Sequence, residues 1–355
     1  MITAYGWSDA LQTAFAPHAA EGLIPGRVTT QNRDLWTLAT DAGELRATLA
    51  GRLMHMAAEG ERPVVGDWVA ISVEGEHGWA RIDTVLPRHT EFSRRAAFTR
   101  QGLQVVAANV DTALLVASMN ADLNPRRLER YLAAARHSGA AMVIVLTKAD
   151  LCPDREAAMN VARAVAFDTP AIAVSAVTGE GLDALAERLE PGKTAALLGS
   201  SGVGKSTLVN ALAGSEIMAT GAIRENDAHG RHTTTHREII LLPSGALLLD
   251  TPGMRELGLI DADSGVEATF ADIEALAGAC RFRDCQHGKE PGCQVRAALE
   301  SGALDEGRWL SFQKLRREVA HIDRKEDRLA QQAERRRWIA ISKSNRARDK
   351  SRDRW

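Results

Sequence analysis

Residues 199–207 read Gly199-Ser200-Ser201-Gly202-Val203-Gly204-Lys205-Ser206-Thr207 and fit the phosphate-binding pattern G-x-x-x-x-G-K-[ST] without a mismatch. The apolar run Thr194–Leu198 before it predicts a buried strand, and Thr207–Ala213, closed by Gly214, predicts a helix. A strand, a glycine-rich loop and a helix aim successive backbone N–H groups at one point, which favours a bound anion. The stretch therefore predicts a nucleotide-phosphate site within an α/β fold. A flexible glycine–serine turn between two core elements is the alternative.

Side chains around this loop have expected roles in handling a nucleotide with Mg²⁺. Lys205 would reach the β- and γ-phosphates, and the Ser206 hydroxyl would bind the magnesium ion. Further along, Asp250-Thr251-Pro252-Gly253 follows an apolar run. Asp250 would hold Mg²⁺ through water, and the Gly253 N–H would donate to the γ-phosphate.

Between these motifs, Gly230–Thr235 reads GRHTTT within polar sequence. We interpret it as a switch loop in which Thr234 binds Mg²⁺ and responds to the γ-phosphate. An edge strand is the alternative, because consecutive threonines favour extended structure.

Bulk properties narrow the protein class. A chain of 355 residues exceeds one ordinary core and predicts two or three domains. The hydrophobic content of 45% and charged content of 25% are typical of a soluble globular protein. No apolar run approaches about 18 residues, and Met1–Gly22 lacks the pattern of a secretory signal, so we expect no membrane span. The formal net charge of −2 does not by itself predict a nucleic-acid partner, and four cysteines fit a reducing cytoplasm.

The first third of the chain is expected to be rich in β-structure. Short strand-like segments separated by turn residues suit a small barrel of the oligonucleotide-binding type. Such barrels contact RNA in some proteins and act as spacers in others, so the pattern leaves RNA contact by this barrel open. The expected strands are Gly26–Thr30, Leu35–Leu38, Leu45–Leu49, Val64–Ile71 and Trp79–Val85.

Strands and helices then alternate, which predicts a parallel sheet covered on both faces. Asn124 followed by Pro125 is a favourable start for the first helix. The expected strands are Asp111–Ser118, Ala141–Leu146 and Ala171–Val174, the helices Arg126–His137, Arg155–Ala166 and Leu182–Leu189, and a closing strand pair Ile239–Leu242 and Ala246–Leu249.

Two loops at the carboxyl ends of these strands suit recognition of guanine. Thr147, Lys148 and Asp150 follow the second strand, where open α/β sheets bind ligands. The Asp150 carboxylate can accept hydrogen bonds from guanine N1–H and the 2-amino group, and Lys148 can lie over the base. After the third strand, Ser175 and Ala176 can offer a backbone N–H to guanine O6. An ordinary surface loop is the alternative for Thr147–Asp150 taken alone.

Cys280, Cys285, His287 and Cys293 have the spacing C-x₄-C-x-H-x₅-C. Three thiolates and one imidazole suit a closed tetrahedral zinc site of the structural kind. An iron–sulfur cluster and unrelated side chains are the alternatives.

The order of these motifs is unusual, because the base-reading loops precede the phosphate loop. This permuted order, the N-terminal barrel and the cysteine cluster resemble the ribosome-small-subunit-dependent GTPase A family over residues 26–330. The resemblance implies hydrolysis of GTP to GDP, one zinc ion per chain, and binding to the small (30S) ribosomal subunit and its 16S rRNA late in that subunit's maturation. Thr147 stands where GTPases usually have asparagine, which predicts a weaker brace to the phosphate loop.

The catalytic residue is expected in the switch loop. Met254 occupies the place of the usual water-orienting glutamine, and a thioether cannot orient water. His232 is the nearest polar candidate, and the resembled family has a histidine there. We therefore expect His232, Lys205 and Thr234 to be catalytic, unless the ribosome supplies the missing group.

The expected organisation is an α/β GTPase with two flanking domains. Residues 1–25 would form an extension, 26–107 the barrel, 108–258 the permuted GTPase domain, and 259–334 a zinc-binding helical domain in which Trp309–Ile322 is a helix. Residues 335–355 carry nine Lys/Arg against two Asp/Glu, which suits phosphate backbones or mere solubility. We expect a cytoplasmic monomer. Its rivals are a P-loop ATPase and a zinc-dependent RNA-binding protein whose GTP site is structural.

Overall fold

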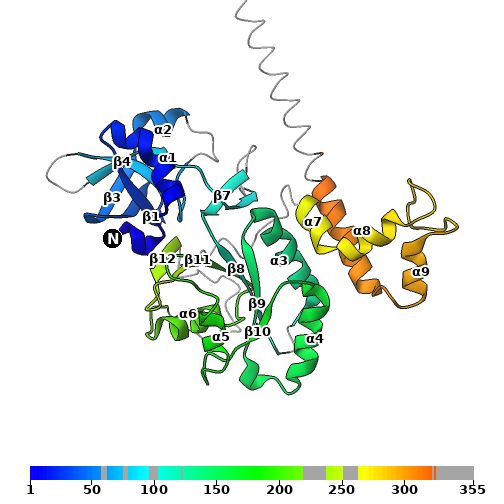
Figure 1. Ribbon diagram of the computed structural model, residues 1–355. Coiled ribbons are helices and arrows are strands. Elements are labelled where there is room, and N and C mark those ends of the chain that lie inside the picture. The colour runs from blue at the N-terminus through cyan, green and yellow to red at the C-terminus, as the bar shows by residue number, and fades with distance from the viewer. Residues whose placement is uncertain are drawn as a thin grey trace, which may run out of the picture.

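The computed structural model describes residues 1–56, 62–74, 79–95, 103–120, 123–218, 237–250, 263–321 and 324. A small barrel, an α/β domain and a C-terminal helical module (residues 263–321) follow one another along the chain. In Figure 1 the barrel and the C-terminal module contact the α/β domain at different places. Among the described residues, no helix is both long and apolar enough to span a bilayer.

The barrel is a closed sheet of five strands, because its first and fourth strands also pair with each other. Adjacent strands of the barrel are antiparallel except for β3 and β5, which run parallel to each other. Closure removes free sheet edges and buries one face of every strand. The strands are β1 (Ile24–Asn32), β2 (Leu35–Thr40), β3 (Gly43–Leu49), β4 (Trp68–Glu74) and β5 (Trp79–Val85), with helix α2 (Gly51–Met56) after β3.

The strand expected from Val64 begins later, at Trp68. Gly66 has φ 96° and turns the chain, and the Val64 N–H donates to the Asp67 carboxylate at 2.8 Å. A Cβ on Gly66 would lie 2.0 Å from the Ala108 carbonyl oxygen, so this turn requires glycine. Val64 and Val65 are buried because the turn packs against the chain, although they form no strand.

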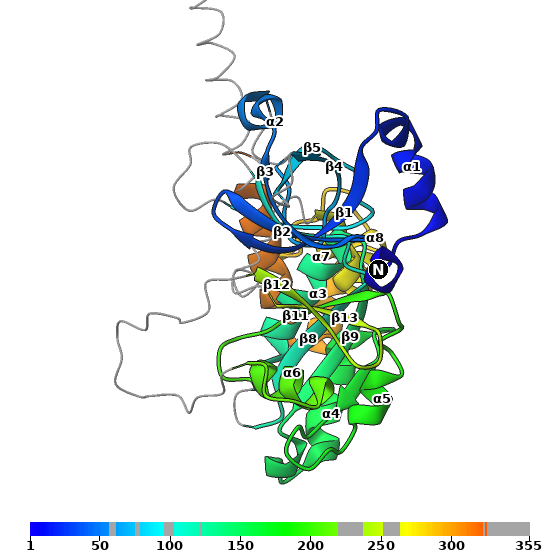
Figure 2. The ribbon, with the colours of Figure 1, turned by 90° about the vertical axis from the view of Figure 1, so that its left-hand side faces the viewer.

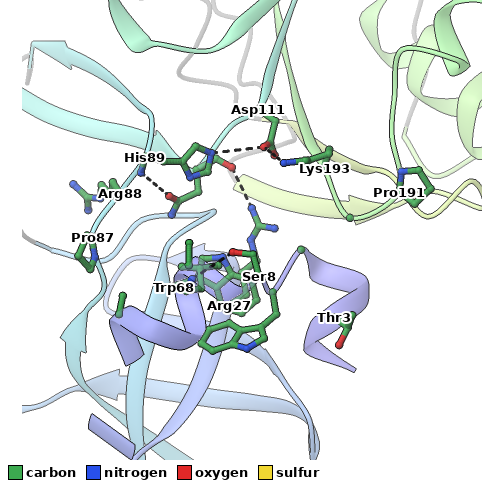
Figure 3. A pocket seen from close by; sticks show the side chains of 17 residues that line it. Thr3, Ser8, Arg27, Trp68, Pro87, Arg88, His89, Asp111, Pro191 and Lys193 are labelled. Atoms are coloured by element: carbon green, nitrogen blue, oxygen red, sulfur yellow. Dashed lines mark hydrogen bonds and ion pairs between the residues drawn. The ribbon is translucent and has the colours of Figure 1, made fainter. Parts of the chain in front are cut away.

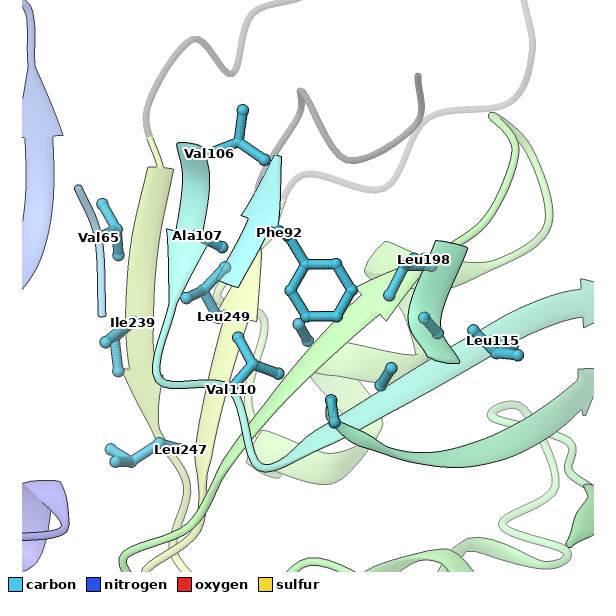
Figure 4. Close-up of a cluster of buried hydrophobic side chains, with 14 of the residues drawn as sticks. Val65, Phe92, Val106, Ala107, Val110, Leu115, Leu198, Ile239, Leu247 and Leu249 are labelled. Atoms are coloured by element: carbon cyan, nitrogen blue, oxygen red, sulfur yellow. The ribbon is translucent and has the colours of Figure 1, made fainter. Parts of the chain in front are cut away.

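Two segments near the barrel, and the short helix α2, had no counterpart in the sequence interpretation. The N-terminal segment forms a 3₁₀ turn, η1 (Ile2–Tyr5), and helix α1 (Asp9–Ala20), which pack Ile2 and Phe15 on Trp68. A hairpin of β6 (Glu91–Arg95) and β7 (Leu103–Ala108) forms a separate sheet. Phe92 of this hairpin lies among the buried side chains of the α/β domain (Figure 4).

The α/β domain has the predicted parallel sheet with helices on both faces. Along β8, alternate residues pack into different clusters, Ala113 and Leu115 with α3 and α4, and Leu114 and Val116 with α5 and α6. The elements are β8 (Thr112–Ser118), α3 (Pro125–Ser138), β9 (Ala141–Thr147), η3 (Ala149–Leu151), α4 (Arg155–Ala166), β10 (Ala171–Ala173), α5 (Leu182–Ala186), β11 (Thr194–Leu198), α6 (Lys205–Ala213), β12 (Arg237–Leu241) and β13 (Leu247–Asp250). The Asn124 side chain caps α3 as expected, accepting from the Arg126 and Arg127 N–H groups.

The barrel and the α/β domain share one continuous sheet in the order β10-β9-β8-β11-β13-β12-β1-β2-β3-β5-β4. The connection is antiparallel pairing of β1 with β12, with Thr30 opposite Glu238 and Gln31 opposite Arg237. Seen from the side, the barrel sits at the β12 end of the α/β sheet (Figure 2).

The C-terminal module contains α7 (Asp263–Thr269), α8 (Ala271–Gly278), α9 (Gln294–Glu300) and a helix over residues 306–321. The last of these contains the predicted apolar stripe. Its residues Trp309, Phe312, Leu315 and Val319 are buried with Phe270 in one core, so the stripe packs inward as expected. Ile322 lies outside the described residues.

Candidate nucleotide and zinc sites

The phosphate loop (residues 199–206) connects the carboxyl end of β11 to the N-terminus of α6. A Cβ on Gly199 would lie 2.4 Å from the Val116 carbonyl oxygen of β8, so this position requires glycine. Gly204 has φ 93° immediately before the helix. The Lys205 ammonium donates to the Gly199 and Ser200 carbonyl oxygens, and both residues belong to the loop. The loop thus has the predicted strand–loop–helix setting, with the lysine folded over it.

The base-reading loop after β9 contacts the phosphate loop directly. The Thr147 hydroxyl lies within hydrogen-bond distance of the Val203 carbonyl oxygen, so a brace is present although asparagine is not. Lys148 has φ 59°, and its ammonium donates to the Gly202 carbonyl oxygen at 2.8 Å. These contacts bring together two motifs that are about 50 residues apart in the sequence.

The other predicted base contacts lie beside this loop. Asp150 is exposed within η3, and the neighbouring Ala149 N–H donates to the Val174 carbonyl, which joins the ends of β9 and β10. Ser175 is buried, its hydroxyl accepts from the Thr178 N–H, and its own N–H donates to Glu180. The Ala176 N–H is therefore the group available for the proposed contact with guanine O6.

Several predicted residues belong to parts of the chain that the structure does not describe. His232, Thr234 and Gly253 are among them, together with Met254 and the basic tail 335–355. Ser206 is half-buried at the start of α6, Ser201 and Thr207 are exposed, and Asp250 ends β13 beside β11. Their roles stay predictions.

Sequence reasoning missed two residues that contact the phosphate loop. Arg127 Nη1 of α3 donates to Ser200 Oγ at 3.0 Å, and Tyr131 Oη lies 3.3 Å from the same atom. The sequence predicted helix α3 but contained no signal for which loop its side chains contact.

The four candidate zinc ligands lie together in the C-terminal module, with ligand atoms within 4.8 Å of one another. His287 Nδ1 is 3.6 Å from Cys280 Sγ and from Cys293 Sγ, and those two sulfurs are 4.0 Å apart. A tetrahedron with metal–sulfur bonds of about 2.3 Å has edges of roughly 3.8 Å, so the cluster has the size that Zn²⁺ requires. The His287 ring also packs edge-on against Trp309, which ties the cluster to the module's core.

A cavity of about 580 Å³ lies elsewhere (Figure 3). It is lined by the N-terminal segment, by Trp68 and Arg27 of the barrel, and by Asp111 and Lys193 at the amino ends of β8 and β11. The phosphate loop lies at the opposite, carboxyl ends of these strands, so this cavity is not the nucleotide site.

Comparison with known proteins identifies the family. The RsgA GTPase family model matches residues 85–260. The chain is 47% identical to the small ribosomal subunit biogenesis GTPase RsgA of Opitutus terrae, covering 100% of this chain and 99% of the relative. It is 48% identical to the protein of that name from Streptomyces coelicolor, over 92% of this chain and 88% of the relative. The chain belongs to the RsgA GTPase family.

Solved structures agree with this assignment. The crystal structure of YjeQ from Thermotoga maritima matches with a TM-score of 0.61 and 26% identity, over 84% of this chain and 99% of that one. YloQ, a circularly permuted GTPase, shares the fold with a TM-score of 0.56 at 23% identity. A model of the ABC transporter family also matches, over residues 182–339, a range that contains the phosphate loop. The full-length similarity to RsgA proteins decides in favour of a circularly permuted GTPase, and the chain is a GTP hydrolase.

Proposed function

We propose that this GTPase binds the small (30S) ribosomal subunit and hydrolyses GTP to GDP and phosphate late in that subunit's maturation. The observation that supports this most strongly is full-length similarity to relatives named for small-subunit biogenesis. The contact between the base-reading loop and the phosphate loop adds support from the geometry. We further propose that the protein acts as a cytoplasmic monomer and contacts 16S rRNA through the basic tail 335–355.

The nucleotide would occupy the carboxyl edge of the sheet. Residues 199–207 would surround the β- and γ-phosphates with backbone N–H groups, and Lys205 would leave the loop carbonyls to bind phosphate oxygens. Ser206, Thr234 and Asp250 would hold Mg²⁺, which supplies positive charge against the phosphates. Asp150 would select guanine, with Lys148 over the base and Ala176 at O6.

Water attack on the γ-phosphate requires a residue that orients the water. We propose His232 for this role, because a neutral imidazole can accept a hydrogen bond from water and Met254 cannot. Gly253 would donate its N–H to the γ-phosphate, and Lys205 would stabilise the charge that develops during transfer.

The Cys280, Cys285, His287 and Cys293 cluster would hold one structural zinc ion. All four ligand positions are filled by the protein, so the ion would have no open position for catalysis. Its proposed role is to fix the fold of the C-terminal module.

The deciding experiment is GTP turnover by the full chain with and without purified small ribosomal subunits. We expect subunits to raise the turnover rate severalfold or more, with ATP unreactive in both conditions. Equal turnover with and without subunits would contradict the proposed partner. Turnover of ATP at the rate of GTP would favour the ATPase alternative.

A second measurement tests the proposed catalytic histidine. His232→Ala should leave GTP affinity near that of the parent while stimulated turnover falls by roughly 10²-fold or more, the usual scale for an acid–base or positioning group. Turnover within a few-fold of the parent would assign the role to the ribosome instead.

A further inference from the structure

Helix α3 contacts the phosphate loop from one side. Arg127 and Tyr131 lie one helical turn apart, and both reach the hydroxyl of Ser200, the second residue of the loop. The cavity between this part of α3 and the loop measures only about 10 Å³. That volume holds at most about one water molecule, so helix and loop are closely packed here. A shift of the helix must therefore either move the loop with it or break these two hydrogen bonds.

The opposite side of α3 carries the C-terminal module. Glu129 is fully buried and accepts from Arg126 at 2.7 Å and from Arg308 of the module at 3.0 Å. Arg308 also forms a bidentate pair with Asp272, with distances of 3.0 and 2.8 Å. Burial alone would lower the pKa of Arg308, but Asp272 and Glu129 raise it above its ordinary value. The guanidinium therefore stays charged and joins the two units.

The contact between the C-terminal module and α3 includes backbone atoms as well as charged side chains. A Cβ on Gly265 of α7 would lie 2.2 Å from the Ala133 carbonyl oxygen of α3, so the two helices touch where glycine has no side chain. Ala133 itself belongs to the module's buried core. At 100° per residue, positions 129 and 133 face away from positions 127 and 131. A single rigid helix thus has the module on one side and the phosphate loop on the other.

We propose that Arg127 and Tyr131 are positioning residues that hold the phosphate loop ready for nucleotide, and that the C-terminal module fixes helix α3 for this purpose. The physical basis is the fraction of the free protein whose loop can already bind phosphates. A looser loop lowers that fraction, and the apparent dissociation constant rises in proportion. The inference rests on the proposed role of residues 199–206 in binding phosphates.

Tyr131→Phe in the full chain tests the local contact, because it removes only the hydroxyl. We expect the dissociation constant for GDP, measured by titration calorimetry, to rise by about 3- to 10-fold, the scale of one hydrogen bond. The turnover number at saturating GTP should stay within about two-fold of the parent, because the bound loop is held by the nucleotide itself. A variant that merely weakened the fold would change its melting temperature and not this affinity.

Lys205→Ala separates failure of this inference from failure of the phosphate site. If Lys205→Ala binds GDP as tightly as the parent, the proposed phosphate site is wrong. If Lys205→Ala loses affinity while Tyr131→Phe matches the parent, the phosphate site stands and the positioning role is overturned.

Arg308→Lys tests the connection from the module, with Arg296→Lys as its matched control. Arg296 pairs with Glu300 on α9 within the same module, at 2.7 Å, and both side chains are largely exposed. We expect Arg308→Lys to raise the dissociation constant for GDP by about 2- to 10-fold, since lysine keeps the charge but loses the bidentate pair. Arg296→Lys should leave it unchanged.

The double variant Tyr131→Phe/Arg308→Lys decides whether both act through one route. A shared route predicts that Arg308→Lys adds little once the Tyr131 hydroxyl is absent. Fully additive effects would overturn the proposed connection. If Arg308→Lys fails to fold, Arg126→Gln takes its place, because Arg126 pairs with Glu129 and Asp305 and is partly exposed. An unchanged affinity in the variant that folds would also overturn the connection.

Discussion

The barrel and the C-terminal module are attached to the α/β domain by different kinds of interaction. The barrel is joined through backbone pairing of β1 with β12 and through Arg27, a buried cation whose described hydrogen bonds go to neutral acceptors. The module is joined through Arg308, which bonds two carboxylates. The pKa of Arg27 is lowered by burial to about 10, whereas that of Arg308 is raised.

The barrel and the C-terminal module are also attached next to different parts of the candidate nucleotide site. Strand β12 begins directly after residues 219–236, which include the predicted switch loop, so the barrel pairs with the strand that this loop enters. The module instead contacts α3, which holds Ser200 of the phosphate loop. We call the attachment of the barrel through β1, β12 and Arg27 the barrel joint, and the attachment of residues 263–321 to α3 the module joint. We expect the barrel joint to be sensitive to changes in the backbone of β12, and the module joint to the loss of single charges.

Among the changes considered, loss of zinc should produce the largest difference between the C-terminal module and the barrel. We expect Cys293→Ser to lower bound zinc from about one ion per chain to nearly none and to remove hydrogen-exchange protection from residues 263–321. In zinc-finger peptides a structural zinc ion supplies roughly 10–16 kcal/mol of folding free energy. The barrel strands, built from a closed hydrogen-bonded sheet, should keep their protection.

Cys152→Ser is the matched control, because this half-buried thiol lies in the α/β domain away from the cluster. It should bind zinc as the parent does. Full protection of the module in zinc-free Cys293→Ser would contradict a structural role for the ion.

Exchange of each buried arginine for methionine compares the joints directly. Arg308→Met leaves Arg126 as the one remaining cationic partner of the buried Glu129 among the described residues, and removing a partner from a buried pair costs about 3–5 kcal/mol. Arg27→Met removes a cation that hydrogen-bonds no carboxylate among the described residues, so we expect a smaller loss, about 1–2 kcal/mol, from unpaired acceptors. Hydrogen exchange of the module and of β1 measures the two effects separately. Equal losses would show that the two joints do not differ in this way.

Proline at residue 237 tests the backbone pairing of the barrel joint. Arg237 lies opposite Gln31 of β1, whereas pairing of β12 with β13 begins one residue later, at Glu238. Arg237→Pro removes an N–H at this junction, and we expect a broader distribution of distances between labels on the barrel and on α4. Arg237→Ala keeps the backbone and should give the parent distribution. A narrow distribution in the proline variant would assign the joint to side chains alone.

The sequence predicted the elements whose signals are local. The phosphate loop, the helix α4 and the zinc-ligand spacing each depend on residues close together in the chain, and the structure places them as expected. The fold class and the GTPase activity are confirmed by the family comparisons. The permuted order of the motifs made this prediction possible, because the order of motifs is visible in the sequence without knowledge of any tertiary contact.

Contacts between distant segments were not predictable in this way. Hairpin β6–β7 has a short, weakly patterned sequence, and it is stabilised by burying Phe92 against the α/β domain. The buried Glu129 carboxylate contacts the C-terminal module through Arg308, which is 179 residues away in the sequence, although Arg126 pairs with it locally. The start of β4 was misplaced because Val64 and Val65 are apolar as strand residues are, although Gly66 turns the chain there.

The smallest expected difference is in the response to pH of two carboxyl groups, Asp67 in the barrel and Asp305 at the contact between the C-terminal module and α3. Asp67 of the barrel is buried and accepts from Arg88 at 2.8 Å through both carboxylate oxygens. Burial raises its pKa above the ordinary value of 3.8 despite Arg88. Asp305 of the module joint has a lowered pKa, chiefly because it accepts from the Arg308 N–H and also pairs with Arg126.

These opposite shifts predict opposite pH windows. Because the folded pKa of Asp67 exceeds its unfolded value, its contribution to stability is fully present below pH 3.8 and is lost as the pH rises through the raised pKa. The contribution of Asp305 is present above 3.8 and is lost only as the pH falls through its lowered pKa. As the pH rises from 3.8 through the raised pKa of Asp67, the free energy of urea unfolding of the parent, minus that of Asp67→Asn, should therefore decrease. The same difference for Asp305→Asn should stay flat over this range, and a flat difference for Asp67→Asn as well would show that Arg88 fully compensates the burial of its carboxylate.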